Sequence, residues 1–508
     1  MSRDLLDRLD KWKHRYGSPA GELETLLDRA ARMPLRDARS AIRLHETLLF
    51  LRAYPHSPAV ARQADAILFT FAGRIRHLLC DEAEAAVFEE PEISGIAGTS
   101  LTAVFSYEFA RDLARRHARS IDIGWDRYDE IDRLGHLAAR FVPMMKEDWP
   151  VEAHTPFREW IAAARGRRGT DLGWLLDRVD RPDAYDAAQI PLTWSIENGP
   201  ASRSRGRLPG RRLFCHAEPL LRRSQISLDR EVAGPPLPVR RLTRVEARRV
   251  LNLIVDTSAV RYRELYGFSH PEESAVYHAR PGRGLDVFFF GTPPQWRLPL
   301  RAYHAGMFFK NGVPAGYIET LSLCERAEVG FNLYYTFREG ESAWLYAKLL
   351  RLCRQMLGVN TFVVDPYQIG HENDEALDSG AFWFYRKLGF RSVDPAAAAL
   401  TEREETRLRA DPGYRSSRRT LEKLAAAYIV YEGPGAEPGA WDRFQIRRLA
   451  MRLQQRDEIG LRGWSEQDRA AYRKILEAKR AGSEARYLRL MQHHPALRAA
   501  YLRLGSAL

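Results

Sequence analysis

The chain of 508 residues has no long apolar run and only four cysteines. No stretch approaches the roughly 18 uninterrupted apolar residues of a membrane-spanning helix, so we expect no membrane span. The first residues alternate charged and apolar side chains and lack the continuous apolar core of a secretory signal. The cysteines show neither disulfide-framework nor metal-ligand spacing. The sequence therefore predicts a reduced, cytoplasmic protein with no structural metal.

Lysine is also scarce, because nine lysines stand against 69 arginines among the 78 basic residues. The net charge is +12, but the arginines are spread along the chain, as is typical of a GC-rich genome. Charge alone is therefore weak evidence for nucleic-acid binding. Arginines gather only between Arg203 and Arg223, in a segment rich in Gly, Pro and Ser that predicts a loop. This loop could contact RNA or an acidic protein, or it could be a solvated basic surface.

The length exceeds the limit of roughly 250–300 residues for one hydrophobic core, so two or more domains are expected. Residues 1–235 are predicted to be mostly helical, with one of the helices at 100–118, and their role is not indicated. Residues 236–433 alternate strand and helix patterns, which predicts a mixed α/β sheet flanked by helices. Residues 434–508 are charged and periodic, which predicts a helical tail.

Strand signals dominate the first half of the α/β region. The Asn311-Gly312 dipeptide lies between two apolar runs and predicts a two-residue hairpin, since both residues tolerate positive φ. The strands expected within residues 236–433 are residues 238–243, 301–310, 315–323, 327–337, 361–365 and 427–431.

The segment from Gly330 to Phe390 has the most informative order of parts. It reads as an aromatic strand, the loop Arg338-Glu339-Gly340-Glu341-Ser342, an amphipathic helix, a second strand, and a helix that ends in Tyr385-Arg386-Lys387-Leu388-Gly389-Phe390. A loop between a strand and a helix N-terminus directs several backbone N–H groups to one spot, where a pyrophosphate can bind. In this order of parts the sequence resembles the GNAT superfamily of acetyl-CoA-dependent N-acyltransferases.

The resemblance implies an acyl-CoA donor, an amine acceptor and a GNAT-like mixed sheet. It assigns to Tyr385 the protonation of the leaving thiolate. It assigns contacts with the coenzyme to Phe337, Arg338, Gly340, Ser342, Ala343 and Asp378. The family has a second glycine near Ser342 or Ala343 and an Asn in place of Asp378. Glu339 and Glu341 are expected in the first turn of the helix, where they would repel a pyrophosphate.

Transfer to an amine also requires a group that removes the amine proton. Glu319 and Glu328, on or beside the central strands, are the main candidates, and His304 and Asp365 are further ones. Tyr385 could instead be one more core aromatic, since three aromatic residues precede it.

Two other functions stay open. The chain could be a GNAT-like binding or scaffold module without catalysis, or a transferase that takes its acyl group from aminoacyl-tRNA. The acidic residues between Asp122 and Asp132 lack the glycine and spacing of a calcium loop, so they predict a solvated helix face.

Overall fold

The computed structural model describes residues 2–148, 155–167, 169–210, 212–459, 464–492 and 494–506. The chain divides into two compact units, each built from several chain segments. Unit 1 comprises Met1–Pro219, Arg249–Ser269 and Asn311–Pro314, and unit 2 comprises Leu220–Arg248, His270–Lys310 and Ala315–Leu508. The predicted fold class, a mixed α/β sheet with a helical N-terminal region and C-terminal helices, is confirmed.

Unit 1 begins with four helices, and two of them start with an ordinary side-chain N-cap. The Asp37 side chain accepts a hydrogen bond from the Ser40 N–H at the start of α3, and Ser57 does the same for Val60 at the start of α4. The α3 helix is buried on nearly all sides, and the buried residues include the polar His45, Glu46 and Arg52. These helices are α1 (Ser2–Trp12), α2 (Gly21–Arg32), α3 (Ala38–Ala53) and α4 (Pro58–Phe69).

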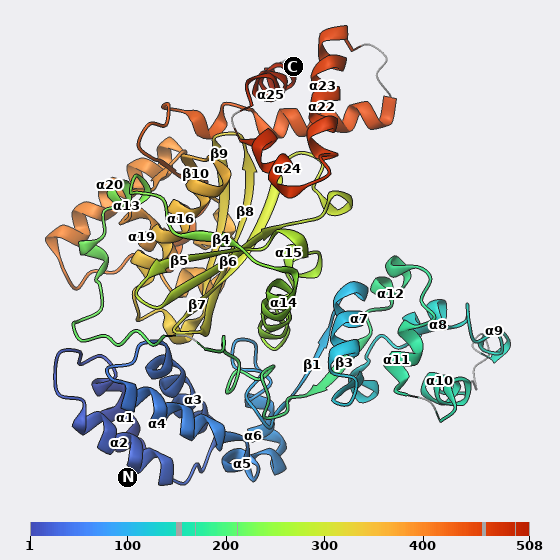
Figure 1. Ribbon diagram of the computed structural model, residues 1–508, viewed down its shortest axis with the longest axis vertical. Helices are drawn as coiled ribbons and strands as arrows, with labels where there is room; N and C mark the ends of the chain where they lie inside the picture. The colour runs from blue at the N-terminus through green and yellow to red at the C-terminus, as the bar shows by residue number, and fades with distance from the viewer. Residues whose placement is uncertain are drawn as a thin grey trace. The chain divides into compact units, whose positions relative to one another are not determined.

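Shorter helices make up most of the rest of unit 1 (Figure 1). They are α5 (Phe71–Ile75), α6 (Glu82–Val87), α7 (Tyr107–Arg116), α8 (Asp132–Ala138), α9 (Met145–Asp148), α10 (Phe157–Arg165), α11 (Asp171–Leu176), α12 (Pro182–Ala188) and α15 (Tyr266–Ser269).

The described part of unit 1 also holds a small antiparallel sheet that the sequence pattern did not predict. Its strands are β1 (Ser100–Val104), β2 (Ile121–Ile123) and β3 (Pro191–Ser195), in the order β1-β3-β2. The helix predicted at 100–118 is therefore wrong at its start, and α7 begins only at Tyr107. The reason is long-range pairing: Thr102 lies opposite Thr193, and their hydroxyls hydrogen-bond at 2.9 Å.

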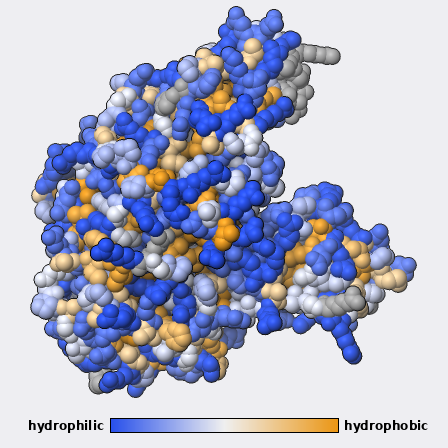
Figure 2. Space-filling model, in the orientation of Figure 1, coloured by the Kyte–Doolittle hydropathy of each residue, from blue (hydrophilic) through white to orange (hydrophobic). Residues whose placement is uncertain are grey.

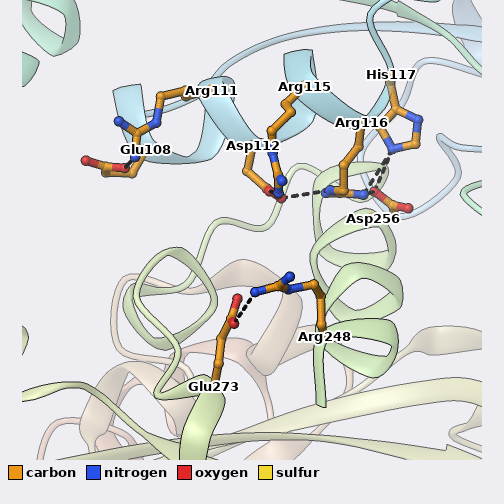
Figure 3. A network of polar contacts seen from close by, with 9 residues as sticks. All are labelled: Glu108, Arg111, Asp112, Arg115, Arg116, His117, Arg248, Asp256 and Glu273. Atoms are coloured by element: carbon orange, nitrogen blue, oxygen red, sulfur yellow. Dashed lines mark hydrogen bonds and ion pairs between the residues drawn. The ribbon is translucent and has the colours of Figure 1, made fainter. Parts of the chain in front are cut away.

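A buried ion pair holds α7 against the second half of α14 (Arg244–Ala259). Asp256 accepts hydrogen bonds from Arg116 Nη1 and, at 2.8 Å, from His117 Nε2 (Figure 3). On the exposed side of α7, Glu108 pairs with Arg111 at 2.7 Å. The Arg248–Glu273 pair in the same view belongs to unit 2.

Unit 2 is built on a sheet that has nine strands within the described residues. The sheet order is β11-β12-β10-β9-β8-β7-β6-β5-β4. Asn311 and Gly312 have φ values of 49° and 80°, which confirms the predicted two-residue hairpin between β7 and β8. The strands are β4 (Val239–Arg241), β5 (Tyr277–Gly282), β6 (Leu285–Gly291), β7 (Ala302–Lys310), β8 (Val313–Leu323), β9 (Arg326–Leu333), β10 (Thr361–Val364), β11 (Arg391–Ser392) and β12 (Ile429–Glu432).

Helices and short 3-10 turns flank this sheet (Figure 1). The helices after β9 are α16 (Ser342–Leu357), α17 (Pro366–Ile369), α18 (Asp374–Asp378), α19 (Ala381–Arg386), α20 (Pro395–Ala410) and α21 (Arg418–Leu424), and α13 (Leu228–Val232) precedes the sheet. The 3-10 turns are η3 (Arg223–Gln225), η4 (Glu273–Ala275), η5 (Pro294–Trp296), η6 (Tyr335–Phe337) and η7 (Ala440–Asp442), and η1 (Leu78–Cys80) and η2 (Trp125–Arg127) lie in unit 1.

The C-terminal helices share a hydrophobic core with the sheet. Ala302 of β7 and Leu323 of β8 lie in one buried cluster with Phe444, Tyr487 and Tyr501. The tail is thus part of unit 2 rather than an appendage, because its helices bury the ends of the central strands. They are α22 (Ile446–Ile459), α23 (Glu466–Lys479), α24 (Glu484–Met491) and α25 (Pro495–Ser506).

The visible surface is largely hydrophilic, and hydrophobic residues form small scattered patches on it (Figure 2). Within the described residues, no helix combines the length and the apolar character required to cross a bilayer.

Candidate functional site

Two parallel strands in the middle of the unit 2 sheet separate part of the way along their length. β9 and β10 are paired at Arg326/Thr361, Ala327/Phe362 and Glu328/Val363. β10 then ends at Val364, whereas β9 continues to Leu333 with β8 as its partner. From Val329 onward, no described strand pairs with the edge of β9 that had faced β10. The sheet is therefore open between the two strands.

A cavity of about 240 Å³ lies at this opening. It is enclosed by the end of β9, the loop that leads into α16, and the helices that follow β10. Its lining residues are Phe331, Asn332, Leu333, Arg338, Ser342, Gln368, Asn373, Glu375, Ala376, Ser379, Ala381, Phe384 and Tyr385.

The free edge of β9 presents backbone groups to the cavity. The Tyr334 N–H donates to Ala315 of β8 at 3.0 Å, and the direction of backbone groups alternates along a strand. Phe331 and Leu333 therefore direct their N–H and C=O groups to the opposite edge. In agreement, the Leu333 carbonyl accepts a hydrogen bond from Arg338 Nε at 3.4 Å. A carbonyl group bound in the cavity would meet N–H donors on this edge.

The N-terminus of α16 supplies further donors. Among the described residues, no acceptor binds the backbone N–H groups of Ser342, Ala343 and Trp344. Ser342 lines the cavity, so the start of this 16-residue helix lies at the cavity wall. Unsatisfied N–H groups and the helix dipole together favour an anion at such a position.

Tyr385 is the one proposed catalytic residue that lines the cavity directly. The residue is 3% exposed, and its ring packs against Tyr346, Phe384 and Phe390 at centroid distances of 5.2–5.6 Å. No described residue accepts from or donates to its hydroxyl group. Burial raises the pKa of Tyr385, so the phenol stays protonated at neutral pH. Its ring belongs to the core packing and its hydroxyl group is bound by no described residue, so both alternatives left open by the sequence stay predictions.

The loop before α16 only partly matches expectation. Arg338 lines the cavity and forms an ion pair with Glu375, another lining residue. Glu341, expected to face a bound pyrophosphate, is instead fully buried. Its carboxylate binds Lys310 Nζ at 3.0 Å, the Arg283 guanidinium, and the Leu221 N–H at 3.2 Å. That expectation is wrong, because Glu341 is the residue before the helix and its side chain neutralises a buried lysine.

Burial of this ion pair shifts the pKa of its lysine. Desolvation lowers the pKa of Lys310 to about 8, and the Glu341 carboxylate opposes that shift. Because the negative charge of Glu341 is paired with Lys310 and Arg283, it does not act as a free negative charge at the start of α16.

The remaining residues assigned to the coenzyme do not line the cavity. Phe337 and Ala343 are buried beside it, and Gly340 forms the turn by donating its N–H to the Phe337 carbonyl at 2.9 Å. Asp378 ends α18 with a side chain that is 77% exposed, and it lies 3.6 Å from Arg418. A coenzyme contact for Asp378 is therefore not supported by its position.

Glu319 does not line the cavity; it lies on β8, opposite Gly330 of β9. It accepts a hydrogen bond from the Tyr303 hydroxyl at 2.5 Å, and burial raises its pKa. A Cβ atom on Gly330 would lie 3.8 Å from the cavity-lining Gln368 and 3.9 Å from Glu319. Gly330 thus lies between Gln368 and the Cβ atom of Glu319, and no side chain of residue 330 fills the space between them.

The other three candidate bases are occupied elsewhere. Glu328 is paired with Arg301 at 2.9 Å and with Arg326 at 3.5 Å. His304 binds the buried Glu484 at 2.7 Å. Asp365 caps α17 by accepting from the Tyr367 N–H at 2.9 Å. None of the three lines the cavity.

Sequence reasoning missed several polar lining residues, among them Asn332, Gln368, Asn373 and Ser379. Of these, only Asn373 carried a usable signal, since its side chain caps α18 by accepting from the Ala376 N–H at 3.2 Å. The described residues contain no group of three or more His, Cys, Asp or Glu that could hold a metal ion.

The arginine-rich segment is more ordered than its composition suggests. Arg203 is buried and binds both carboxylate oxygens of Glu46 at 2.8 and 2.9 Å, so it cannot contact a partner. Arg207 pairs with Asp65, and the Arg205 guanidinium lies 4.1 Å above the Phe69 ring. Arg211 lies outside the described residues.

Neither a protein-family model, nor a curated protein, nor a solved structure matches the chain.

Proposed function

We propose that this chain is an N-acyltransferase of the GNAT type, which moves an acyl group from acyl-CoA to an amine. The observation that carries the proposal is the separation of β9 and β10 with a cavity at the opening. Such an opening gives a narrow pantetheine arm access to the middle of a sheet. There the backbone N–H groups on the free edge of β9 can donate hydrogen bonds to a carbonyl. The order of loop, helix and second strand in the sequence supports the same reading.

The donor is proposed to bind with its pyrophosphate at the start of α16. The N–H groups of Ser342, Ala343 and Trp344 and the helix dipole favour that anion. Arg338 can add a positive charge if it exchanges its partner Glu375 for the phosphate. The acyl-thioester end would then lie between Phe331, Leu333 and Tyr385.

The proposed chemistry is direct attack by the amine nitrogen on the thioester carbonyl carbon. The backbone N–H of Leu333 or Phe331 stabilises the developing negative charge on the carbonyl oxygen. The carbon–sulfur bond breaks, and the Tyr385 hydroxyl donates its proton to the departing thiolate. Glu319 accepts the proton of the attacking amine through a water molecule, a role that its raised pKa suits.

The proposal is tested by calorimetric titration of the full chain with acetyl-CoA and with longer acyl-CoAs. A matched pair of variants places the site: Ala381→Trp fills the cavity, whereas Ala399→Trp puts the same side chain on the exposed face of α20. We expect binding to wild type and to the Ala399 variant, and at least a ~100-fold weaker affinity for the Ala381 variant.

Three outcomes would contradict the proposal. Absence of binding for every acyl-CoA at millimolar concentration would favour a non-catalytic binding module. Equal binding to both variants would place the ligand outside this cavity. Salt-sensitive binding of tRNA without acyl-CoA binding would favour transfer from aminoacyl-tRNA.

A further inference from the structure

A second cavity in unit 2 contains a buried lysine. This cavity has a volume of about 440 Å³ and lies between the segment that follows β6, helix α22 and helix α23. Its walls are mainly apolar, with Leu298, Leu453, Ile475 and Leu476 among the lining residues. Lys479, the last residue of α23, also lines it and is only 9% exposed.

The Lys479 amino group is held by neutral acceptors. Nζ donates to the Arg301 carbonyl at 3.0 Å and to the Tyr487 hydroxyl at 3.0 Å. Among the described residues, no carboxylate forms an ion pair with it. The Glu484 carboxylate forms its ion pairs with other residues, His304 at 2.7 Å and Arg297 at 3.4 Å.

A second cation lies next to this lysine. The Arg297 guanidinium is 2% exposed, lines the same cavity and stacks 3.9 Å above the Tyr487 ring. Burial and the charge of Arg297 together lower the pKa of Lys479 to about 7. A lysine desolvated in an apolar pocket beside another cation is the setting in which a lysine amine becomes a nucleophile.

The lowered pKa has a consequence for reactivity. At pH 7 a larger fraction of Lys479 than of an ordinary lysine carries a free amine, which is the nucleophilic form. Lys479 itself is among the residues that line the cavity, as is its neighbour Arg297.

We infer that Lys479 is a carbonyl-reactive lysine, which condenses reversibly with an aldehyde or ketone that has an apolar body. The Nζ lone pair forms a bond to the carbonyl carbon, and one amine proton moves to the carbonyl oxygen, which gives a carbinolamine. The Tyr487 hydroxyl, 3.0 Å from Nζ, accepts the amine proton as it donates its own to that oxygen. Loss of the carbinolamine hydroxyl together with the second amine proton, as water, leaves the C=N bond of an imine.

The rim of the cavity indicates the class of ligand more closely. Arg480 lines the cavity and is exposed, so its guanidinium can bind a carboxylate at the entrance. The apolar walls accept a branched hydrocarbon. A keto acid with an aliphatic chain therefore fits both features.

The experiment is reductive trapping on the full-length protein at pH 7. The probes are 4-methyl-2-oxopentanoate and 3-methylbutanal, which share the same hydrocarbon but differ in the carboxylate. Sodium cyanoborohydride reduces any imine to a stable secondary amine, and peptide mass spectrometry measures the modified fraction of each lysine. Lys474 is the internal control, since it is exposed on the same helix. The ratio of the two sites cancels the intrinsic reactivity of each probe.

We expect Lys479 to be modified at least about 10-fold more than Lys474 with both probes. The Lys479→Arg variant, which retains the positive charge, should lose that adduct and keep the one at Lys474. Tyr487→Phe should slow modification of Lys479, with folding checked by circular dichroism. A higher site ratio for the keto acid than for the aldehyde would support the role of Arg480.

Two results would overturn the inference. Modification of Lys479 no faster than Lys474 in the folded protein would show that its amine is not reactive. Modification of Lys479 only after unfolding in urea would show that it is a buried structural residue without ligand access.

Discussion

Replacement of Glu341 by Gln is expected to destabilise unit 2 rather than to improve coenzyme binding. At pH 7 the lowered pKa of Lys310, about 8 against 10.5, already costs about 3 kcal/mol. Without Glu341 the folded lysine would lose its proton, which limits its total cost to about 5 kcal/mol at pH 7. The extra cost through Lys310 is therefore roughly 1–2 kcal/mol. Loss of the charged hydrogen bonds to Arg283 and Leu221 adds about 1.5–3 kcal/mol.

The sum, roughly 3–5 kcal/mol, agrees with the usual cost of breaking a buried ion pair. It is measured by urea unfolding at pH 7, with Glu339→Gln as the exposed control from the same loop, expected within about 0.5 kcal/mol of wild type. Between pH 8 and 10.5 the unfolded chain binds the Lys310 proton and the folded chain does not, so this group makes stability rise with pH. The difference between the Glu341 variant and wild type should therefore shrink from pH 7 to pH 10. A loss below about 1 kcal/mol at pH 7, or one independent of pH, would refute this account.

Three further predictions concern the two cavities. Tyr385→Phe should lower turnover by about 10²–10⁴-fold while the free energy of unfolding stays within about 0.5 kcal/mol, because the hydroxyl bonds to no described residue; unchanged turnover would remove it from the mechanism. Glu319→Gln should lower kcat/KM by a similar factor. In the wild type kcat/KM should fall at acidic pH, because the Glu319 carboxyl group, whose pKa is raised by burial, acts as a base only when deprotonated; the variant should lack this fall. Lys479→Met should reduce the rise of stability that urea unfolding measures between pH 7 and pH 9, because only the unfolded state of the wild type keeps that proton in this range; an unaltered slope would contradict the pKa of about 7.

The elements of unit 2 were largely predictable because their signals are local. Asn311-Gly312 defined a hairpin through backbone preference alone, and the alternation of strand and helix patterns around Gly358 separated α16 from β10. These features depend on residues that are neighbours in the sequence.

Features that depend on distant residues were not predictable in the same way. Ser100–Val104 became a strand because Pro191–Ser195 pairs with it, about ninety residues away. The burial of Glu341 depends on Lys310 and Arg283, which no helix-start rule can anticipate. A charge in a first turn looks like a surface feature until its partners in space are known.

The candidate site shows the same division. Arg338, Ser342 and Tyr385 line the cavity and were identified from one local pattern. Asp378 was assigned by the same pattern but is turned to solvent, and Asn332 and Gln368 enter only through the arrangement of β9 and α17. The sequence motif identified the loop and the end of the helix. The other residues that line the cavity are brought there by the three-dimensional arrangement.

Unit 1 is assembled from three separate segments of the chain, and this has a consequence for biosynthesis and for truncation. Asp256, which Arg116 and His117 hold, comes from a segment far downstream of the rest of unit 1. A nascent chain must therefore extend past Asp256 before that carboxylate can bind Arg116 and His117, and past residue 314 before unit 1 has all its parts. A fragment cut after residue 235, where the sequence suggests a boundary, would leave Arg116 without its buried acceptor. Such a fragment should aggregate or be degraded, and co-expression with the remainder of the chain is the arrangement in which it can be rescued.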